Sequence, residues 1–248
     1  TDQSGNAYKE TVDGVNVSDG YGGNQGENNV YSDNRTKYKY DLGDRIQFPS
    51  LSSPYGGYPS YQEYLRNNAL VISDPAQLNN LANIRPNSNF NYSGADGSIS
   101  MDGSGNLVVN GIVYIDGGNL GMNKSGPNKT INYTGRGTIF TTGNASINVN
   151  LYTQGNSSFP DNIIGVMTPN TINFNEANTD VMGLFYAEDD IIAQKQVDVV
   201  GAFASNFFDM GTNVPSIFQV LAVIDNLPPG MIGTEPIWII KVVSWQKL

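Results

Sequence analysis

The sequence predicts an all-β protein: a parallel β-solenoid, or β-helix, preceded by a short N-terminal segment whose one or two small helices cap the solenoid. Three observations predict this fold. Charged residues make up only 15% of the 248 residues, and the chain holds 28 glycines among many Asn, Ser and Thr. A glycine followed by a β-prone apolar run recurs along the chain, and most of these runs precede a second short strand. Such a pattern is typical of short strands joined by turns rather than of helices.

The glycine-led strands recur in order from about residue 96, with their first glycines 26, 28, 18 and 18 residues apart. They are GIVYI (111–115), GTIFT (137–141), GVMT (165–168), GLFYA (183–187) and GAFAS (201–205). A coil of this size cannot bury its own inward face, so successive coils stack and share one core. A β-sandwich, which also uses short alternating strands, is the competing interpretation. We expect residues 96–248 to form the solenoid with a C-terminal strand.

Residues 1–95 are expected to form the N-terminal strand and helix segment that caps the solenoid. Short strands are predicted at 12–20 and 36–43. Ser60, followed three residues later by Glu63, forms a capping-box pattern that begins a helix. A second helix is predicted over 73–84, because Asp74 suits an N-cap and Pro75 the first helical position. A cap is physically expected, since an uncovered sheet edge invites aggregation.

The composition excludes several kinds of chemistry. The chain has no His and no Cys, so a Ser-His-Asp triad, a His-ligated metal and a thiol nucleophile are impossible. Its net charge of −10 makes nucleic acid an improbable partner, because phosphate contacts need clustered Lys and Arg. Lys124, Lys129 and Arg136 make too small a basic group for that purpose. We therefore expect no cofactor and no metal.

The stretch GRGTIFTTGNASINVN (135–150) has glycines like those of a phosphate-binding loop. Such a loop needs a helix N-terminus after its glycines, and here an alternating strand follows. We therefore expect Ile139, Ile147 and Val149 to point into the core. Arg136 is expected at a solvated turn.

Four tyrosines recur every third residue, at Tyr55, Tyr58, Tyr61 and Tyr64. If exposed, Tyr55, Tyr58 and Tyr61 are candidate binding residues that could stack on sugars or on a partner surface. Their helical spacing also fits packing against the solenoid, which is the simpler interpretation.

Acidic residues raise two further possibilities. Asp180, in an Asn-Thr-Asp sequence, is followed by Asp189 and Asp190, as in glycosidases that use paired carboxylates on a β-helix. The offset of nine positions from Asp180 to Asp189 is too short for carboxylates stacked on adjacent coils. The same acidic residues, with Glu176 and Asp198, could bind a hard cation such as calcium, but no calcium-loop motif is present.

The C-terminal sequences NLPPGMIG (226–233) and SWQKL (244–248) resemble the C-terminal signature of PilX-like proteins, which are associated with bacterial type IV pili. In that family a Leu-Pro-Pro-Gly step follows a run of glycine-led strands, and the chain ends in a Ser-Trp segment. GTIFTTGNASINVN (137–150) and residues 181–205 resemble its repeating core, and 48–65 resembles its pre-solenoid segment. The resemblance implies a cell-surface or pilus-tip role and carries over no catalytic residue.

We therefore expect a non-enzymatic, extracellular domain of a pilus-associated, minor-pilin-like surface protein that serves structure or adhesion. Its partners would be other pilus or cell-surface proteins, with polysaccharide as a further possibility. PilX-like proteins are anchored by a hydrophobic N-terminal helix, so membrane contact is expected only through such an anchor upstream of Thr1. The alternatives are a self-assembling extracellular filament subunit and a carbohydrate-active β-helix enzyme.

Overall fold

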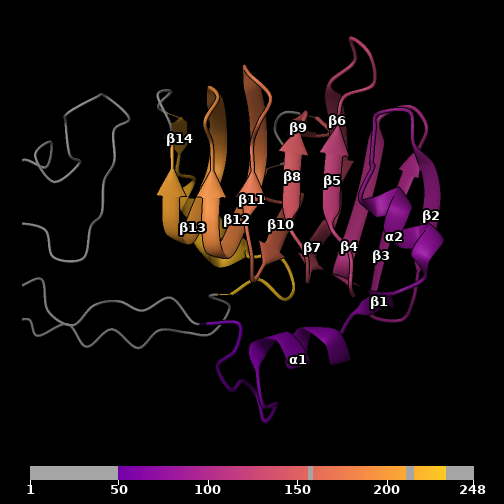
Figure 1. Ribbon diagram of the computed structural model, residues 1–248, viewed down its shortest axis with the longest axis vertical. Coiled ribbons are helices and arrows are strands. Elements are labelled where there is room, and N and C mark those ends of the chain that lie inside the picture. The colour runs from indigo at the N-terminus through magenta and orange to yellow at the C-terminus, as the bar shows by residue number, and fades with distance from the viewer. Residues whose placement is uncertain (1–49, 156–158, 211–214, 233–248) are drawn as a thin grey trace, which may run out of the picture.

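The computed structural model describes residues 50–155, 159–210 and 215–232. The strands predicted at 12–20 and 36–43, the predicted C-terminal strand and the Ser-Trp segment lie outside these residues. The described chain is mostly β, with few and short helices (Figure 1). No helix in the described ranges has the length and apolar character needed to cross a membrane.

The described elements follow the chain in a simple order. They are α1 (Tyr61–Asn67), β1 (Leu70–Ile72), α2 (Pro75–Leu81), β2 (Asn89–Ser93), β3 (Gly97–Asp102), β4 (Asn106–Ile115), β5 (Leu120–Asn123), β6 (Thr130–Thr134), β7 (Arg136–Thr141), β8 (Ala145–Asn148), β9 (Asn150–Thr153), β10 (Ile163–Thr168), β11 (Ile172–Asn173), β12 (Thr179–Ile192), β13 (Val197–Asp209), β14 (Ser216–Phe218) and the 3₁₀ helix η2 (Leu221–Asn226).

The strands belong to one sheet, and six of them close into a ring of parallel pairs. Around the ring, β4 pairs with β6, β6 with β9, β9 with β12, β12 with β10, β10 with β7, and β7 with β4. Further strands extend this six-stranded parallel barrel: β13 and β14 beyond β12, the row β5, β8 and β11, and β1, β2 and β3 next to β4. The prediction of a parallel β-solenoid is therefore wrong.

Two long strands explain the correction. The sequence pattern suggests separate strands at 106–109 and 111–115, but they form the single strand β4, which continues through Gly111 at φ 67°. Likewise the sequence pattern suggests separate strands at 183–187 and 190–193, but β12 continues from the first into the second as far as Ile192, with an irregular register between Ala187 and Asp190. Because β4 and β12 each pair with different strands along their length, the sheet closes on itself. The spacing of short apolar runs does not reveal this continuity.

Glycines permit the close approach of neighbouring strands. Gly111 lies opposite Gly137, and Gly183 lies opposite Gly201. At Gly201, where φ is 141°, a Cβ atom would lie 1.9 Å from the carbonyl oxygen of Gly183. At four of the recurring glycines, Gly111, Gly137, Gly183 and Gly201, a Cβ atom would therefore collide with the backbone of a neighbouring segment, whereas at Gly165 it would meet side chains.

The inner core is a continuous apolar cluster inside the sheet. Ile139, Ile147 and Val149 are fully buried in it, as predicted. Phe174, Phe185 and Phe203 pack there with ring centroids 5.0–5.5 Å apart. Such aromatic packing contributes beyond the burial of area alone.

Both predicted helices are confirmed. The Ser60 side chain accepts a hydrogen bond from the Glu63 amide (3.1 Å), which begins α1. The Asp74 side chain accepts hydrogen bonds from the amides of Ala76 and Gln77 and so caps α2, which begins at Pro75. In Figure 1, α2 lies at one end of the row of strands and β13 and β14 at the other. β1 pairs with β4, so the predicted N-terminal segment contributes to the sheet. The proposed division at residue 95 stays a prediction.

Candidate functional site

A second apolar layer lies on the outer face of β4, β7, β10 and β12. Ile112, Tyr114, Phe140, Met167 and Leu184 are buried there, although each lies outside the inner core. Tyr114 and Phe140 stack with ring centroids 4.8 Å apart. Strands buried on both faces read as continuous apolar runs, which accounts for IVYI and LFYA in the sequence.

Two segments cover this outer face. One is α1 with the residues before it, which buries Leu51, Tyr61 and Leu65. The other is the C-terminal strap, defined as residues 219–232, which buries Val223 and Met231. Residues far apart in the sequence thus form one layer, which no local pattern reports.

Arg136 holds the C-terminal strap. Its guanidinium donates to the carbonyl oxygens of Asn226 (3.1 Å) and Leu227 (3.3 Å), and also approaches the Asn226 side chain and the Pro160 carbonyl. These carbonyls lie at the C-terminal end of η2, where unpaired oxygens attract a cation. The expectation of a solvated turn is therefore wrong: Arg136 is half-buried, and it binds the chain's own backbone.

The Leu-Pro-Pro-Gly step (227–230) joins the C-terminal strap to α1 and to the sheet. The hydroxyl of Tyr61 donates to the carbonyl of Gly230 (3.2 Å). Gly230 has φ 74°, and a Cβ atom there would lie 2.7 Å from Ile112 and 3.0 Å from Leu65. Of the two motifs in the PilX-like signature, the Leu-Pro-Pro-Gly step is the one that lies within the described residues. Here it packs the C-terminal strap tightly against α1 and β4.

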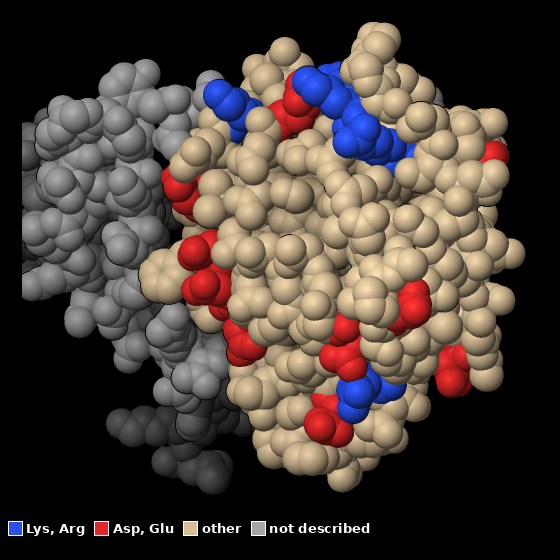
Figure 2. Space-filling model, turned by 45° about the vertical axis from the view of Figure 1, so that its right-hand side comes forward, with Lys and Arg blue, Asp and Glu red and all other residues tan. Residues whose placement is uncertain are grey.

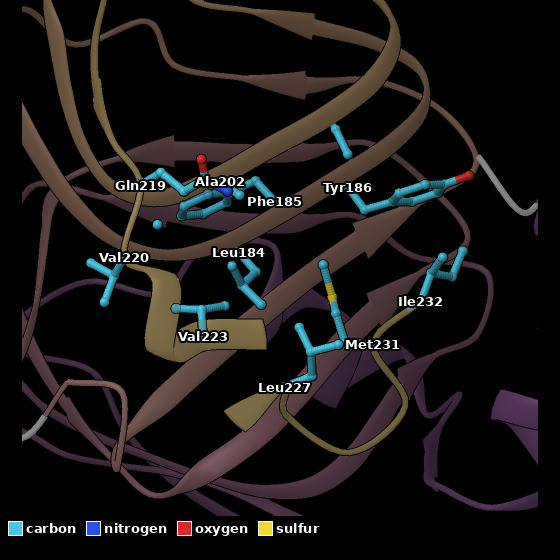
Figure 3. A pocket seen from close by; sticks show the side chains of 12 residues that line it. Leu184, Phe185, Tyr186, Ala202, Gln219, Val220, Val223, Leu227, Met231 and Ile232 are labelled. Carbon is cyan, nitrogen blue, oxygen red and sulfur yellow. The ribbon is translucent and has the colours of Figure 1, made fainter. Parts of the chain in front are cut away.

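A pocket of about 260 Å³ remains between the C-terminal strap and strands β12 and β13. Figure 3 shows Val223, Met231 and Ile232 of the strap facing Leu184 and Tyr186 of β12. Burial, and then the charge of Glu188, raise the pKa of Tyr186 to about 12, so this phenol is neutral at physiological pH. The sequence analysis missed the pocket, although the apolar run LFYA signals a strand buried on both faces.

The tyrosine group forms a cluster around α1. The rings of Tyr55 and Tyr61 are 4.5 Å apart, those of Tyr55 and Tyr64 are 4.7 Å apart, and those of Tyr58 and Tyr64 are 5.6 Å apart. Tyr61 is buried, while Tyr55, Tyr58 and Tyr64 are half-buried. Only Tyr61 and Tyr64 lie on α1, whereas Tyr55 and Tyr58 form an antiparallel bridge in the turn before it, so the turn and the helix together bring the rings into contact. That Tyr55, Tyr58 and Tyr61 bind a sugar or a partner stays a prediction.

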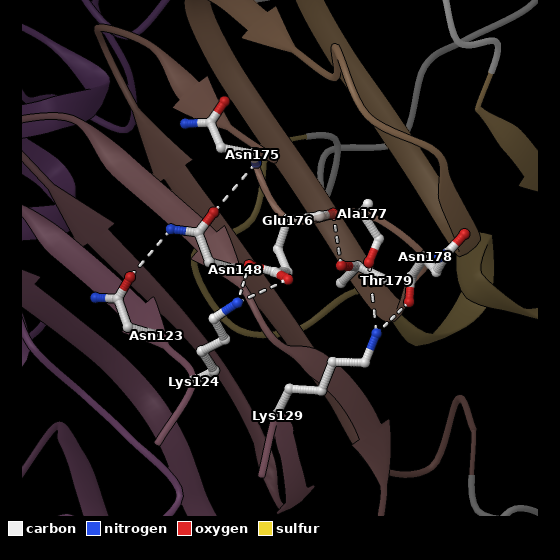
Figure 4. Close-up of polar contacts among 9 residues, drawn as sticks. All are labelled: Asn123, Lys124, Lys129, Asn148, Asn175, Glu176, Ala177, Asn178 and Thr179. Atoms are coloured by element: carbon white, nitrogen blue, oxygen red, sulfur yellow. Dashed lines mark hydrogen bonds and ion pairs between the residues drawn. The ribbon is translucent and has the colours of Figure 1, made fainter. Parts of the chain in front are cut away.

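The lysines of the predicted basic group serve polar contacts on another part of the sheet (Figure 4). Lys124 forms an ion pair with Glu176 (2.9 Å), and Lys129 donates to the carbonyls of Ala177 and Asn178. Next to them, Asn148 donates to Asn123 (3.0 Å) and accepts from the Asn175 amide (3.1 Å), which links β5, β8 and the end of β11. Charged side chains otherwise lie in small separate groups on the face shown in Figure 2.

The acidic candidates do not converge on a metal site within the described chain, where no group of three or more potential ligands is present. Asp180 accepts a hydrogen bond from the Tyr152 hydroxyl (2.6 Å). Asp189 and Asp190 lie toward the other end of the same strand, β12. Across the neighbouring strands, Asp180 lies opposite Asp198 of β13, whereas Asp190 lies opposite Phe207, so the candidates form one facing pair and no larger group among the described residues.

Among the comparisons with known proteins, only the search of solved structures gives a match, and it concerns the fold. No protein-family model matches the chain, and no curated protein matches it. The crystal structure of the competence-associated pilin ComZ from Thermus thermophilus is similar, with a TM-score of 0.55 and 17% sequence identity over 78% of this chain and 49% of that chain. This chain therefore corresponds to about half the length of that pilin. At this identity, the likeness shows a shared fold.

Proposed function

We propose that this chain is a non-enzymatic, extracellular domain of a pilus-associated surface protein with a structural, minor-pilin-like role. The observation that carries the proposal is the similarity in fold to the competence-associated pilin ComZ. The Leu-Pro-Pro-Gly step, which resembles that of PilX-like proteins, adds independent support from the sequence. Its partners would be other pilus proteins.

The arrangement of the outer face fits a structural role. Its layer is made of apolar side chains, with Arg136 and Tyr61 bound to backbone oxygens. Groups used in this way rigidify a domain and leave its exposed surfaces for contacts with partners. Adhesion would need an additional ligand site, for which the tyrosine cluster is the candidate.

The proposal is tested by locating the protein in its own cells. Because the chain has no Cys, Ser104→Cys in the exposed turn between β3 and β4 would give one reactive thiol in this domain. We expect a membrane-impermeant maleimide to label this variant on intact cells, and the labelled protein to appear in the sheared pilus fraction. Ala145→Cys, at a fully buried position, is the control for unfolded protein and should stay unlabelled.

Labelling of Ser104→Cys only after cell lysis would refute an extracellular location. Labelling on intact cells without any protein in the sheared pilus fraction, in a strain that makes pili, would refute pilus association while keeping the surface location.

A further inference from the structure

The pocket beneath the C-terminal strap originates in a step in side-chain size on the outer face of the sheet. One row of outward residues pairs in register across five parallel strands, and its members are Tyr114, Phe140, Met167, Tyr186 and Ala204. In the next row, Leu184 of β12 lies opposite Ala202 of β13. Because an alanine side chain ends at Cβ, the outer layer becomes thinner at β13, where both alanines border the pocket.

The C-terminal strap fills a comparable gap elsewhere on this face but not this one. At Gly165 of β10, a Cβ atom would lie 3.0 Å from the Met231 sulfur and 3.2 Å from Pro228, so side chains of the strap occupy that space. Over Ala202 and Ala204, a volume of about 260 Å³ remains. Voids inside proteins rarely exceed the size of a water molecule, so this volume is a cavity able to hold a ligand rather than a packing defect.

Apolar groups enclose the pocket from both the sheet and the strap. The lining residues that are 1–7% exposed are Leu184, Phe185, Tyr186, Val223 and Met231. The described part of the lining includes no Asp, Glu, Lys or Arg. An ion that entered would therefore lose its hydration without gaining an opposite charge. The lining thus selects uncharged ligands.

Polar side chains mark the two ends of the pocket. Figure 3 shows Gln219 at one end and Tyr186 at the other, with Leu184 and Met231 between them. Gln219 is exposed, so its amide lies at the rim. An apolar pocket with a few polar groups at its ends is typical of small-molecule sites, where the polar groups fix the orientation of the ligand.

The volume of the pocket limits the size of the ligand. An apolar cavity of about 150 Å³ holds one benzene ring. In proportion, a pocket of about 260 Å³ holds about ten non-hydrogen atoms. This is the size of a bicyclic aromatic compound.

We propose that this pocket binds a small, uncharged, mainly apolar molecule of about ten non-hydrogen atoms. Ala202 and Ala204 would form its floor and Val223 and Met231 its cover, while the amide of Gln219 would bind one polar group at the rim. Because buried side chains enclose the pocket, a free molecule can enter it completely, whereas a side chain of a partner protein would have to keep its backbone at the rim. This inference does not depend on the proposed function.

The probe is indole, an uncharged bicyclic compound of this size. Calorimetric titration of the full chain should show saturable binding with a Kd of about 0.1–1 mM and a negative change in heat capacity, as burial of an apolar ligand requires. Met231 is one of six methionines in the chain, and it lines the pocket. In protein labelled with ¹³C at the methionine methyl groups, indole should shift the Met231 signal most; Met231→Leu identifies this signal by removing it. Indole-5-carboxylate and 5-(aminomethyl)indole, which have the same ring and a charge, should bind at least about tenfold more weakly.

Two substitutions fill the pocket from its floor. Ala204→Leu and Ala202→Leu should each weaken indole binding at least about tenfold, since the added side chain takes the place of the ligand. Ala222→Leu is the matched control and should leave binding unchanged, because Ala222 is exposed on the same strap and is not among the lining residues. Circular dichroism checks that each variant is folded, and the shift of the Met231 signal in the original protein tests the site without any of these variants.

Absence of indole binding, equal binding of the charged analogues, or binding that both leucine variants retain would overturn the proposal. So would binding that shifts other methionine signals and leaves that of Met231 unchanged. If the end-blocked peptide Gly-Gly-Trp-Gly-Gly bound as tightly as indole, the pocket would instead be assigned to a side chain of a partner protein. Binding that occurs only after residues 233–248 are removed would assign it to the chain's own C-terminal residues. Either assignment would also overturn the proposal.

Discussion

The guanidinium of Arg136 connects the start of β7 to the end of η2, 90 residues further along the chain. Four oxygens surround it, from Pro160, Asn226 and Leu227. Hydrogen bonds from a charged donor are stronger than those between neutral groups, and these satisfy carbonyls that the short helix leaves unpaired. Single residues of this kind decide where the C-terminal strap lies.

Replacing Arg136 by Ala should lower the free energy of unfolding by about 1–2 kcal/mol, because partly buried carbonyls lose a charged donor. The measurement is urea denaturation followed by circular dichroism. Lys124→Ala, which removes a lysine from an exposed ion pair, is the matched control and should cost much less. Equal effects of the two substitutions would contradict the role given to Arg136.

Tyr152 provides a test at high pH. Burial, followed by its hydrogen bond to Asp180, raises the pKa of Tyr152 to about 12, against about 10 for a free tyrosine. The unfolded chain therefore loses this proton first, so the stabilising contribution is complete below pH 10 and is lost as the pH rises toward 12. Tyr152→Phe should make the decline in the free energy of unfolding between pH 10 and 12 less steep.

The same measurements between pH 7 and 9 give the control for Tyr152→Phe. There the difference between the variant and the original protein should be constant, since neither the folded nor the unfolded state titrates this residue. An unchanged slope between pH 10 and 12 would show that Tyr152 does not contribute to alkaline unfolding.

Among the elements, β12 and β13 form the longest parallel pair, from Thr179–Val197 to Ile192–Asp209. Gly183 and Gly201 lie opposite each other in this pair, and the backbone of one occupies the space where a side chain of the other would begin. The two strands also line the pocket under the C-terminal strap. The position of the C-terminal strap therefore depends on the pairing of β12 with β13.

Gly201→Ala should destabilise the protein by about 2–4 kcal/mol, because its Cβ atom would overlap the Gly183 carbonyl and the strands would have to separate. The matched control is Gly126→Ala: Gly126 also has positive φ (57°), but a Cβ atom there meets nothing within 4 Å. This control should cost about 1 kcal/mol, from backbone strain alone. Thermal and urea unfolding measure both variants, and equal costs would exclude close approach as the reason for Gly201.

At the scale of the whole molecule, the six-stranded parallel barrel and the apolar layer on its outer face connect α1, the strands and the C-terminal strap. Leu65 of α1 is fully buried against the outer face, next to Gly230 of the C-terminal strap and Ile112 of β4. Segments from both ends of the described chain thus share one core with the middle. Such an arrangement predicts cooperative unfolding of the described region.

Unfolding followed by circular dichroism and by tyrosine fluorescence should show one transition with the same midpoint. Leu65→Ala should move this whole transition by about 2–5 kcal/mol, since it leaves a cavity in the shared layer. Arg66→Ala, the exposed neighbour on the same helix, should hardly change it. Two separate transitions, with only one sensitive to Leu65→Ala, would instead support separate units on either side of residue 95.

The sequence by itself determined the local features of this protein. Ser60 with Glu63, and Asp74 with Pro75, begin the two helices because capping depends on residues a few positions apart. The alternation of apolar and polar residues correctly predicted that Ile139, Ile147 and Val149 lie in the core, because the direction of a side chain in a strand also depends only on its near neighbours in sequence. Only the tertiary structure decided that β4 and β12 are continuous and close the sheet, that Arg136 binds Asn226 and Leu227, and that a pocket lies under the C-terminal strap. These features depend on which distant segments come together, and because apolar burial is not directional, a local pattern can mark a buried residue without specifying its partner.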